Sequence, residues 1–453
     1  MTKKTAAIIA GALFIVLGGI AAAGGGYMYK QIKDYSNVIN PEVVIEDIDL
    51  SQKNKKQAED ILREKYGDAV LKKKISIKDS AKTYIVDYSK LSAKFNIEET
   101  VDEALKFGKN LSFFEKYKLI KSPTPAYFKL KFTYDINPVK ELIAGMQKEI
   151  DKAPVNADIT MPSSGSFKVA PEKNGVKLNA EKLESEIISK ISGDLGGDIE
   201  IEAPIEEVKA AITSSMLAKV NTIISSFSTS FAGSSENRSE NIRLSTNVIN
   251  GKLLMPGDSF GFNDVVGKRT AERGYKEAPV IINNKLESDL GGGICQVSTT
   301  LYNAVIRANI NATERHLHTL PSHYIGLGMD ATVDYGNLDY KFKNTLEYPI
   351  FIEGFVKGNN IVFNIYSDSS YTRRTYDLVS EVYETLQPEI KYADDSNMYE
   401  DQTETVQKAS IGYRVKVYKK IYENGNLVGQ EQVSNSTYKP VNGVVKRGTK
   451  KRT

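Results

Sequence analysis

The chain has 453 residues, enough for two to four domains that each bury their own hydrophobic core. Its 60 basic and 57 acidic residues leave a formal net charge of +3, which gives no electrostatic footprint for nucleic acid as a partner. Hydrophobic residues make up 41% and charged residues 26%, both ordinary for a globular protein.

The N-terminus carries an uncharged stretch from Thr5 to Tyr29, long enough to cross a hydrocarbon core of about 30 Å. Lys3 and Lys4 precede it and predict a cytoplasmic N-terminus, with the rest of the chain outside the membrane. A cleaved signal peptide is the alternative, because the three alanines at 21–23 are small enough to precede a cleavage site. The length of the stretch favours a retained anchor, so we expect residues 1–30 to be a cytoplasmic tip and a transmembrane helix.

Two similar blocks follow, and together they predict a duplicated helix–strand–strand–helix module over residues 31–205. Asn96 and Asn179 open the last helix of each block and are predicted to cap it. Neither block contains a set of residues that suggests an active site, which indicates a scaffold or a binding surface. The predicted elements are a helix over 51–67, strands over 74–79 and 82–88, a helix over 96–109, a helix over 137–153, strands over 157–161 and 165–171, and a helix over 179–193.

The next domain is expected over residues 206–372, with a leading helix predicted from the spacing of apolar residues over 203–231. Near its end, "KGNN" separates two alternating runs and predicts a β-hairpin. Residues 373–453 are expected to form an antiparallel β-module, in which "ENGN" predicts a second hairpin. The basic tail "KRGTKKRT" is expected to be disordered. The whole chain is thus predicted to be a multidomain α+β protein.

Cys295 is the only cysteine in the sequence, so an intramolecular disulfide is impossible and the thiol stays unpaired. It follows three glycines in "GGGICQVSTTLYNAVIRA", at the predicted start of a helix. The positive end of a helix dipole lowers the pKa of a thiol, and the free N–H groups from Gly293 to Gln296 could stabilise an oxyanion. Ser298 follows on another face of the helix. A buried structural cysteine is the alternative.

The three histidines of the chain lie together, and one of them is the candidate base for the thiol. His316 and His318 would share one face of an extended segment, and His323 follows shortly after. Asp330 or Asp334 could fix the tautomer of the imidazole. A zinc site or a surface cluster without function are the alternatives.

Basic residues precede the cysteine in "VVGKRTAERGY". Arg269 and Arg273 are candidates to bind a substrate carboxylate, because a guanidinium can hold a carboxylate through two hydrogen bonds. A solvated charged loop is the alternative.

Several of these motifs together resemble the VanW domain of bacterial envelope proteins. They are "NIRLSTNVINGKLLMPGDSFGFNDVVGKRTAERGYKEAPVI", "GGGICQVSTTLYNA", "ERHLHT" and "DATVDYG", in the order in which that family has them. The duplicated region resembles the peptidoglycan-binding domain that often precedes it. The segment "EQVSNSTYKPVNGVVKRGT" resembles the G-five domain, which is linked to amino-sugar binding.

The resemblance implies a membrane-anchored protein of a Gram-positive-type bacterium, with an extracellular ectodomain that faces the cell wall. Some VanW proteins are regarded as L,D-transpeptidases with a catalytic cysteine. That role would fall on Cys295, with His316 and His318 at the family's His-x-His and His323 less favoured. The expected reaction is 3→3 cross-linking of peptidoglycan stem peptides through a thioester, with no cofactor and no metal. The alternatives are a protein that only binds peptidoglycan or glycopeptide, and a cysteine peptidoglycan hydrolase.

Overall fold

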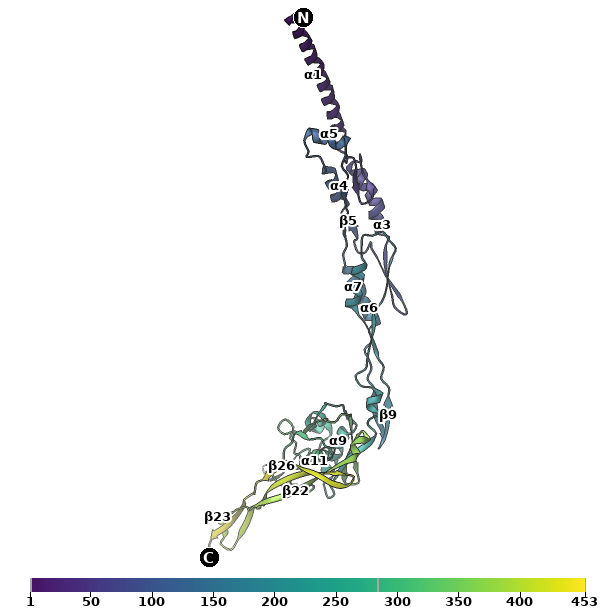
Figure 1. Cartoon of the computed structure of the whole chain (residues 1–453). Coiled ribbons are helices and arrows are strands. Elements are labelled where there is room, and N and C mark those ends of the chain that lie inside the picture. The colour runs from purple at the N-terminus through teal and green to yellow at the C-terminus, as the bar shows by residue number, and fades with distance from the viewer. Residues whose placement is uncertain (1, 283–284, 453) are drawn as a thin grey trace. The chain divides into compact units, whose positions relative to one another are not determined.

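The computed structural model describes residues 2–282 and 285–452 (Figure 1). The chain forms two compact units. The first comprises Met1–Pro154 and Asn174–Lys209, and the second comprises Val155–Lys173 and Ala210–Thr453. Helices and sheets are segregated in both units, which confirms the multidomain α+β class.

The first unit begins with α1 (Lys3–Asp34), a continuous helix drawn in purple in Figure 1. Its segment Ile8–Asp34 has a mean hydropathy of 2.2 at its most apolar, and that part is not buried against the rest of the chain. The helix is therefore long and apolar enough to cross a membrane.

The first unit contains two hydrophobic cores, and the expected helices and strands of residues 51–109 and 137–193 are mostly confirmed. One core, which includes Ile39 and Val101, lies among α2 (Lys55–Leu62), α4 (Ile97–Lys106) and the sheet β2-β1-β6. The other, which includes Ile75 and Ile143, lies between α6 (Asn137–Ile150), α7 (Ala180–Lys190) and the sheet β11-β3-β4. The strands and short helices of this unit are β1 (Val43–Ile45), β2 (Ile48–Asp49), a π-helical turn (Arg63–Gly67), α3 (Asp68–Val70), β3 (Lys74–Lys78), β4 (Thr83–Asp87), β5 (Lys94–Phe95), α5 (Phe113–Lys121), β6 (Ala126–Phe128), β7 (Phe132–Thr133), β10 (Gly175–Leu178), β11 (Ile199–Glu202) and β12 (Ile205–Val208).

Of the two asparagines that were predicted to cap a helix, one does so and the other does not. The side chain of Asn179 accepts a hydrogen bond from the N–H of Lys182 and caps α7 as expected. Asn96 does not cap α4, because its side-chain oxygen accepts instead from the N–H of Lys131 at 2.6 Å.

The two predicted blocks also occupy different surroundings. The first hairpin, β3–β4, belongs to a three-stranded sheet of the first unit. The second hairpin, β8 (Asp158–Ser163) and β9 (Ser166–Ala170), belongs to the second compact unit. There Phe167 packs edge-on against Phe351 and Tyr366, with ring centroids 5.2 and 5.0 Å apart.

The main core of the second unit lies against the antiparallel sheet β13-β21-β20-β14. Two helices pack on this sheet, α9 (Glu236–Ile249) and α11 (Ile294–Arg307). The expected hairpin at "KGNN" is confirmed, since β20 (Ile350–Lys357) turns directly into β21 (Asn360–Ser367). The remaining elements before residue 370 are α8 (Ser214–Leu217), β13 (Thr222–Ser230), β14 (Lys252–Leu254), β15 (Ser259–Gly261), α10 (Phe262–Val266), a 3₁₀ turn (Ala271–Arg273), β16 (Glu277–Ile282), β17 (Lys285–Leu290), β18 (Ala312–Glu314) and β19 (Lys341–Lys343).

The leading helix predicted over 203–231 is wrong. This segment forms β12, the single turn α8 and the long strand β13. The sequence of β13, "TIISSFSTS", is rich in β-branched and hydroxyl residues, and it pairs with β21 along its whole length. Sheet pairing therefore outweighs the helical spacing of its apolar residues.

Two sheets form the C-terminal part, after a 3₁₀ turn at Ser369–Arg373. The sheet β22-β25-β26 is antiparallel, and the hairpin predicted at "ENGN" joins β25 to β26. In the other sheet, β27 pairs in parallel with β23 and antiparallel with β24. The strands are β22 (Arg374–Leu386), β23 (Ile390–Tyr399), β24 (Thr403–Gln407), β25 (Gly412–Glu423), β26 (Asn426–Tyr438) and β27 (Gly443–Lys450).

The prediction of a disordered basic tail is wrong for residues up to Lys450. This part belongs to β27, the central strand of its sheet. The positive charges are compensated across the strands: Lys446 lies 3.5 Å from Asp395, and Arg447 is bonded to Asp394. Opposite charges on neighbouring strands stabilise the pairing that the composition alone did not indicate.

Candidate active site

Cys295 lies in the first turn of α11, directly after the glycine turn, as the sequence predicts. Gly293 precedes the helix with φ +106°, a conformation that side-chain-bearing residues rarely adopt. A Cβ on Gly292 would lie 2.7 Å from the carbonyl oxygens of Ala278 and Pro279 in β16. The glycines therefore let the turn pack tightly on a neighbouring strand and leave the thiol half-buried at the helix start.

His318 faces the thiol and is held by Asp330. Its Nδ1 lies 2.6 Å from Oδ2 of Asp330, which also accepts a hydrogen bond from the backbone N–H of His318 at 2.7 Å. The two side chains are 10% and 1% exposed. Because Nδ1 is engaged by Asp330, the other ring nitrogen is the one available to the sulfur of Cys295, with which the ring interacts. These three residues form the arrangement of nucleophile, base and orienting acid.

The electrostatics of this group favour a thiolate beside an imidazolium. Burial raises the pKa of the Cys295 thiol, but the hydrogen bond with His318 and its charge outweigh burial, so the pKa lies below its usual value. Burial lowers the pKa of His318, but the hydrogen bonds with Asp330 and Cys295 prevail and raise it to about 10. The thiol is therefore activated in the way that nucleophilic cysteines require.

The oxyanion donors predicted between Gly293 and Gln296 are only partly free. The N–H groups of Ile294 and Gln296 donate to the carbonyls of Gly291 and Gly293, at 3.2 and 3.1 Å. Within the described part of the chain, the N–H groups of Gly293 and Cys295 have no acceptor. These two donors flank the thiol and are the ones that can reach an oxyanion.

The side chains of Gln296 and Ser298 are engaged by the protein itself. The amide of Gln296 donates to Thr229 and Ser230 and accepts from Arg238 at 2.9 Å. The hydroxyl of Ser298 donates to the carbonyl of Ala331 at 2.6 Å. Both residues are buried, and their hydrogen bonds fasten α11 to the neighbouring segments.

The two candidate arginines have different environments. Arg269 donates to Oδ1 of Asn263 at 2.6 Å, while its Nη2 atom is buried without a hydrogen-bond partner. Its charge contributes to the low pKa of Cys295, so the guanidinium lies near the thiol. Arg273 is exposed and donates to the carbonyl of Lys268. The unpaired nitrogen beside the nucleophile therefore belongs to Arg269.

The other candidates lie outside the hydrogen-bonded group. His316 contacts Glu314 at 3.2 Å with 39% of its side chain exposed. His323 is exposed, and its ring lies against Tyr324. The carboxylate of Asp334 accepts from Asn337 at 2.7 Å. In the described residues, no group of three or more His, Cys, Asp or Glu side chains is placed to hold a metal ion.

Comparisons with protein families match three parts of this chain. Residues 237–366, which include Cys295, His318 and Asp330, match the family described as "VanW like protein". The chain contains a VanW-like domain. Residues 84–200 match the "Putative peptidoglycan binding domain" and residues 378–450 the "G5 domain".

Two curated relatives are similar to part of this chain. The uncharacterized protein YoaR of Bacillus subtilis is 42% identical over 134 residues, which are 30% of this chain and 44% of that protein. The vancomycin B-type resistance protein VanW of Enterococcus faecalis is 28% identical over 133 residues, which are 28% of this chain and 48% of that protein. The matches thus span about half the length of these relatives.

Two solved structures resemble the C-terminal domain. The IgA1 protease G5 domain has 22% identity and a TM-score of 0.14, and it covers 17% of this chain and 90% of that one. HP0197-G5 has 17% identity and a TM-score of 0.12, and it covers 17% of this chain and 95% of that one.

The G5 domain contributes a residue to the site of the VanW-like domain, which the sequence analysis missed. Tyr438, at the end of β26, donates its hydroxyl to Oδ1 of Asp330 at 2.6 Å. The same hydroxyl accepts from the N–H of Gly328 at 2.8 Å, and the side chain is buried. The only signal was a tyrosine in "SNSTYKP", far along the chain, and nothing local to it indicates this partner.

Arg315 and Arg238 are two further residues that the sequence analysis missed. Arg315 donates to the carbonyls of Asp330 and Gly328, at 2.8 and 2.9 Å, and so holds the segment that carries Asp330. Arg238, on α9, donates to Gln296 and fastens the residue that follows Cys295. For Arg315, its place beside the His-x-His motif was the available signal.

Proposed function

We propose that this chain is a cysteine acyltransferase of the cell wall, an L,D-transpeptidase that forms 3→3 cross-links between peptidoglycan stems. The VanW-like, peptidoglycan-binding and G5 domains support a role at the cell wall. The observation that carries the catalytic part is the hydrogen-bonded group of Cys295, His318 and Asp330 at the start of α11.

In the acylation step, the thiolate of Cys295 attacks the carbonyl carbon of the third stem residue. The N–H groups of Gly293 and Cys295 stabilise the oxyanion that forms. As the tetrahedral intermediate collapses, the C–N bond to the terminal D-amino acid breaks, and the imidazolium of His318 gives its proton to the leaving amine. The products are a thioester on Cys295, the free D-amino acid and a neutral His318.

In the transfer step, the side-chain amine of a second stem attacks the thioester. Neutral His318 takes a proton from the attacking nitrogen, and the C–S bond breaks to return the thiolate. A new amide then joins the third residues of two stems. The leaving D-amino acid carries a free carboxylate, and Arg269, with its unpaired buried nitrogen, is the group we assign to bind it.

The helix α1 is proposed to hold the protein in the cell membrane with the remaining residues on the outer side. Its length and hydropathy support a membrane-spanning anchor, and the lysines at its start support a cytoplasmic N-terminus. This placement brings the ectodomain to the cell wall.

The test is to incubate the full-length protein in vesicles with disaccharide tetrapeptide stems and to analyse the products by mass spectrometry. We expect 3→3 cross-linked dimers, a thioester adduct on Cys295, and neither product with Cys295→Ala at an unchanged melting temperature. Tripeptide products without dimers would indicate the hydrolase instead. Stem binding without any product, unchanged in Cys295→Ala, would indicate a protein that only binds peptidoglycan.

A further inference from the structure

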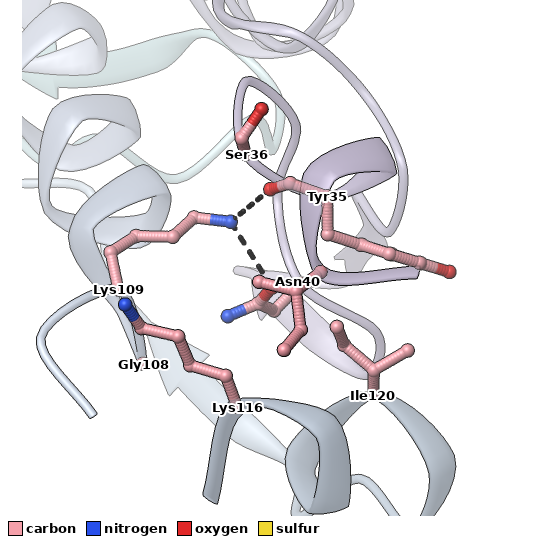
Figure 2. Close-up of a pocket in the computed structure, with 8 residues that line it drawn as sticks. Tyr35, Ser36, Asn40, Gly108, Lys109, Lys116 and Ile120 are labelled. Carbon is pink, nitrogen blue, oxygen red and sulfur yellow. Dashed lines mark hydrogen bonds between the residues drawn. The ribbon is translucent and has the colours of Figure 1, made fainter. Parts of the chain in front are cut away.

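Lys109 forms hydrogen bonds that fasten the end of α1 to the rest of the first unit. The ammonium of Lys109 donates to the carbonyl of Tyr35, to that of Val38 at 2.8 Å, and to Oδ1 of Asn40 at 3.1 Å. Figure 2 shows Lys109 reaching toward Tyr35 and Asn40. Tyr35 is the residue that follows the last residue of α1, and the carbonyls at a helix end lack partners within the helix, so Lys109 satisfies one of them. The contacts fix α1 to the segment that carries α5.

The helix α5 lies beside this end of α1 (Figure 1). Lys121, in its last turn, contacts Oε1 of Gln31 at 3.2 Å and the hydroxyl of Tyr27 at 3.4 Å. Tyr27 and Tyr29 lie where the uncharged stretch of α1 ends, and both are more than half exposed. Tyrosines at such a position are typical of the interface between a membrane and water, and the proposed anchorage of α1 would place α5 at the level of the lipid headgroups.

The start of α5 exposes aromatic side chains. Phe114 is 73% exposed and Phe113 39%, and their rings pack edge to face with centroids 5.6 Å apart. Leu111, just before the helix, is 39% exposed as well. Neighbouring exposed side chains of this size are unusual on a surface that meets only water, and they indicate an interaction site.

The same helix carries the lysines Lys116, Lys118 and Lys121. Its acidic residue, Glu115, is engaged in the capping box with Ser112. A cavity of about 200 Å³ lies between α5 and the end of α1, and its lining includes Lys109 and Lys116 but no carboxylate (Figure 2). Burial and the nearby Lys116 lower the pKa of Lys109 to about 8. The three lysines of α5 outnumber its single acidic residue, so this surface is cationic and suits an anion.

We propose that α5 is a second membrane contact, in which Phe113 and Phe114 enter the outer headgroup region and Lys116, Lys118 and Lys121 bind the phosphates of anionic lipids. The inference rests on the proposed membrane anchorage of α1. Exposed aromatic rings next to basic residues are the composition by which helices bind the surface of an anionic bilayer. Because Lys109 and Lys121 fasten α5 to the end of α1, α5 would hold the adjacent part of the first unit against the membrane.

The chain contains no tryptophan, so a single introduced tryptophan reports its own depth in a bilayer. We would compare the full-length variants Leu17→Trp, Phe114→Trp and Ile85→Trp in vesicles of phosphatidylglycerol with brominated acyl chains, which quench tryptophan by contact. Leu17 probes α1. Ile85 is the control, because it lies on β4, in the sheet β11-β3-β4, and is 51% exposed. We expect quenching and a blue-shifted emission for Leu17→Trp and Phe114→Trp, and neither for Ile85→Trp.

Quenching of Leu17→Trp without quenching of Phe114→Trp would overturn the second contact while leaving the anchor intact. Quenching of Phe114→Trp alone would support the contact of α5 and contradict the membrane-spanning anchor. In neutral phosphatidylcholine vesicles, Phe114→Trp should be quenched less than in phosphatidylglycerol. Replacing the three lysines of α5 with glutamine should remove that difference, and a response equal in both lipids before the replacement would overturn the binding of phosphates.

Discussion

The hydroxyl of Tyr438 lies 2.6 Å from Oδ1 of Asp330, the carboxylate that orients His318. Both residues are buried, and Tyr438 lies at the end of β26 in the G5 domain, whereas Asp330 belongs to the VanW-like domain. The two domains therefore share one hydrogen-bonded network, and the G5 domain is part of the candidate active site.

Replacing this tyrosine tests whether the shared hydrogen bond positions the carboxylate. Tyr438→Phe removes the donor to Oδ1 of Asp330 and the acceptor of the N–H of Gly328, and a hydrogen bond to a charged group contributes roughly 1.5–3 kcal/mol. We expect kcat to fall by roughly 10- to 100-fold with little change in KM. Tyr340→Phe is the control, because the buried hydroxyl of Tyr340 has no partner. Equal losses in both variants would contradict a positioning role for Tyr438.

The two histidines of the motif should differ in their effect on the rate. His318→Ala removes the group that contacts Cys295 and Asp330, and a positioned acid–base group contributes on the order of 10²-fold or more. His316→Ala should change the rate little, because the hydrogen bond of the His316 ring within the described structure goes to the carboxylate of Glu314 and not to Cys295 or Asp330. Single-turnover acylation measures both. A larger loss in His316→Ala would mean that the base has been assigned to the wrong residue.

The pH dependence of the activity should be set by the protonation of Cys295 and His318. The pKa of Cys295 is lowered by its hydrogen bond with His318, and the pKa of His318 is raised to about 10, so the thiolate and the imidazolium coexist at pH values between these two pKa values. Activity should rise as Cys295 loses its proton and fall as pH increases through about 10, where His318 has no proton for the leaving amine. Thiol alkylation in His318→Asn should show a higher midpoint, since burial still raises the pKa of Cys295. An unchanged midpoint would contradict the pairing.

Substitutions of Arg269 and Arg273 test which of the two arginines binds the carboxylate of the substrate. Arg269→Ala should raise KM by roughly 10- to 100-fold, the value of one or two charge-assisted hydrogen bonds to a substrate carboxylate. Arg273→Ala should leave KM unchanged, because that side chain is exposed and donates to the carbonyl of Lys268. Donor stems amidated at the terminal carboxylate provide a second measurement. If Arg269→Ala discriminated against them as strongly as the native protein, the carboxylate assignment would be wrong.

The glycine turn before the thiol should resist substitution. Gly292→Ala places a methyl group 2.7 Å from two backbone carbonyls of β16, and overpacking of this kind costs about 1–3 kcal/mol. Gly145→Ala is the control, because a Cβ at Gly145 has nothing within 4 Å and lies inside α6, where alanine stabilises by roughly 0.5–1 kcal/mol. Chemical denaturation compares the two. Equal stability in both variants would contradict close packing of the turn.

Local features of the sequence were sufficient for the helix start at Ile294 and for both predicted hairpins. A glycine turn, an alternating strand or an "ENGN" turn acts over a few residues, so its outcome does not depend on the remainder of the chain. The candidate site was predicted as far as its residues are close in sequence: Cys295, the His-x-His pair and Asp330 all lie within one segment.

Long-range pairing explains what the sequence did not indicate. Asn96 reads as a cap, yet its oxygen accepts from Lys131, which lies far along the chain. The segment that forms β13 has helical spacing, but its partner β21 lies beyond the segment that contains Cys295, His318 and Asp330. Choosing between Asp330 and Asp334, or finding Tyr438, likewise required knowing which strands meet.

The hydrogen bond from Tyr438 also sets an order of events during synthesis. Ribosomes make the N-terminal part of a chain first, so Cys295, His318 and Asp330 are complete well before Tyr438 has been added. Until the last strand of the β22-β25-β26 sheet has formed, Oδ1 of Asp330 lacks the donor that Tyr438 supplies, and the N–H of Gly328 lacks its acceptor. A nascent or truncated chain would therefore carry the thiol without its full orienting network, and nucleophilic competence would mature only with the completed polypeptide.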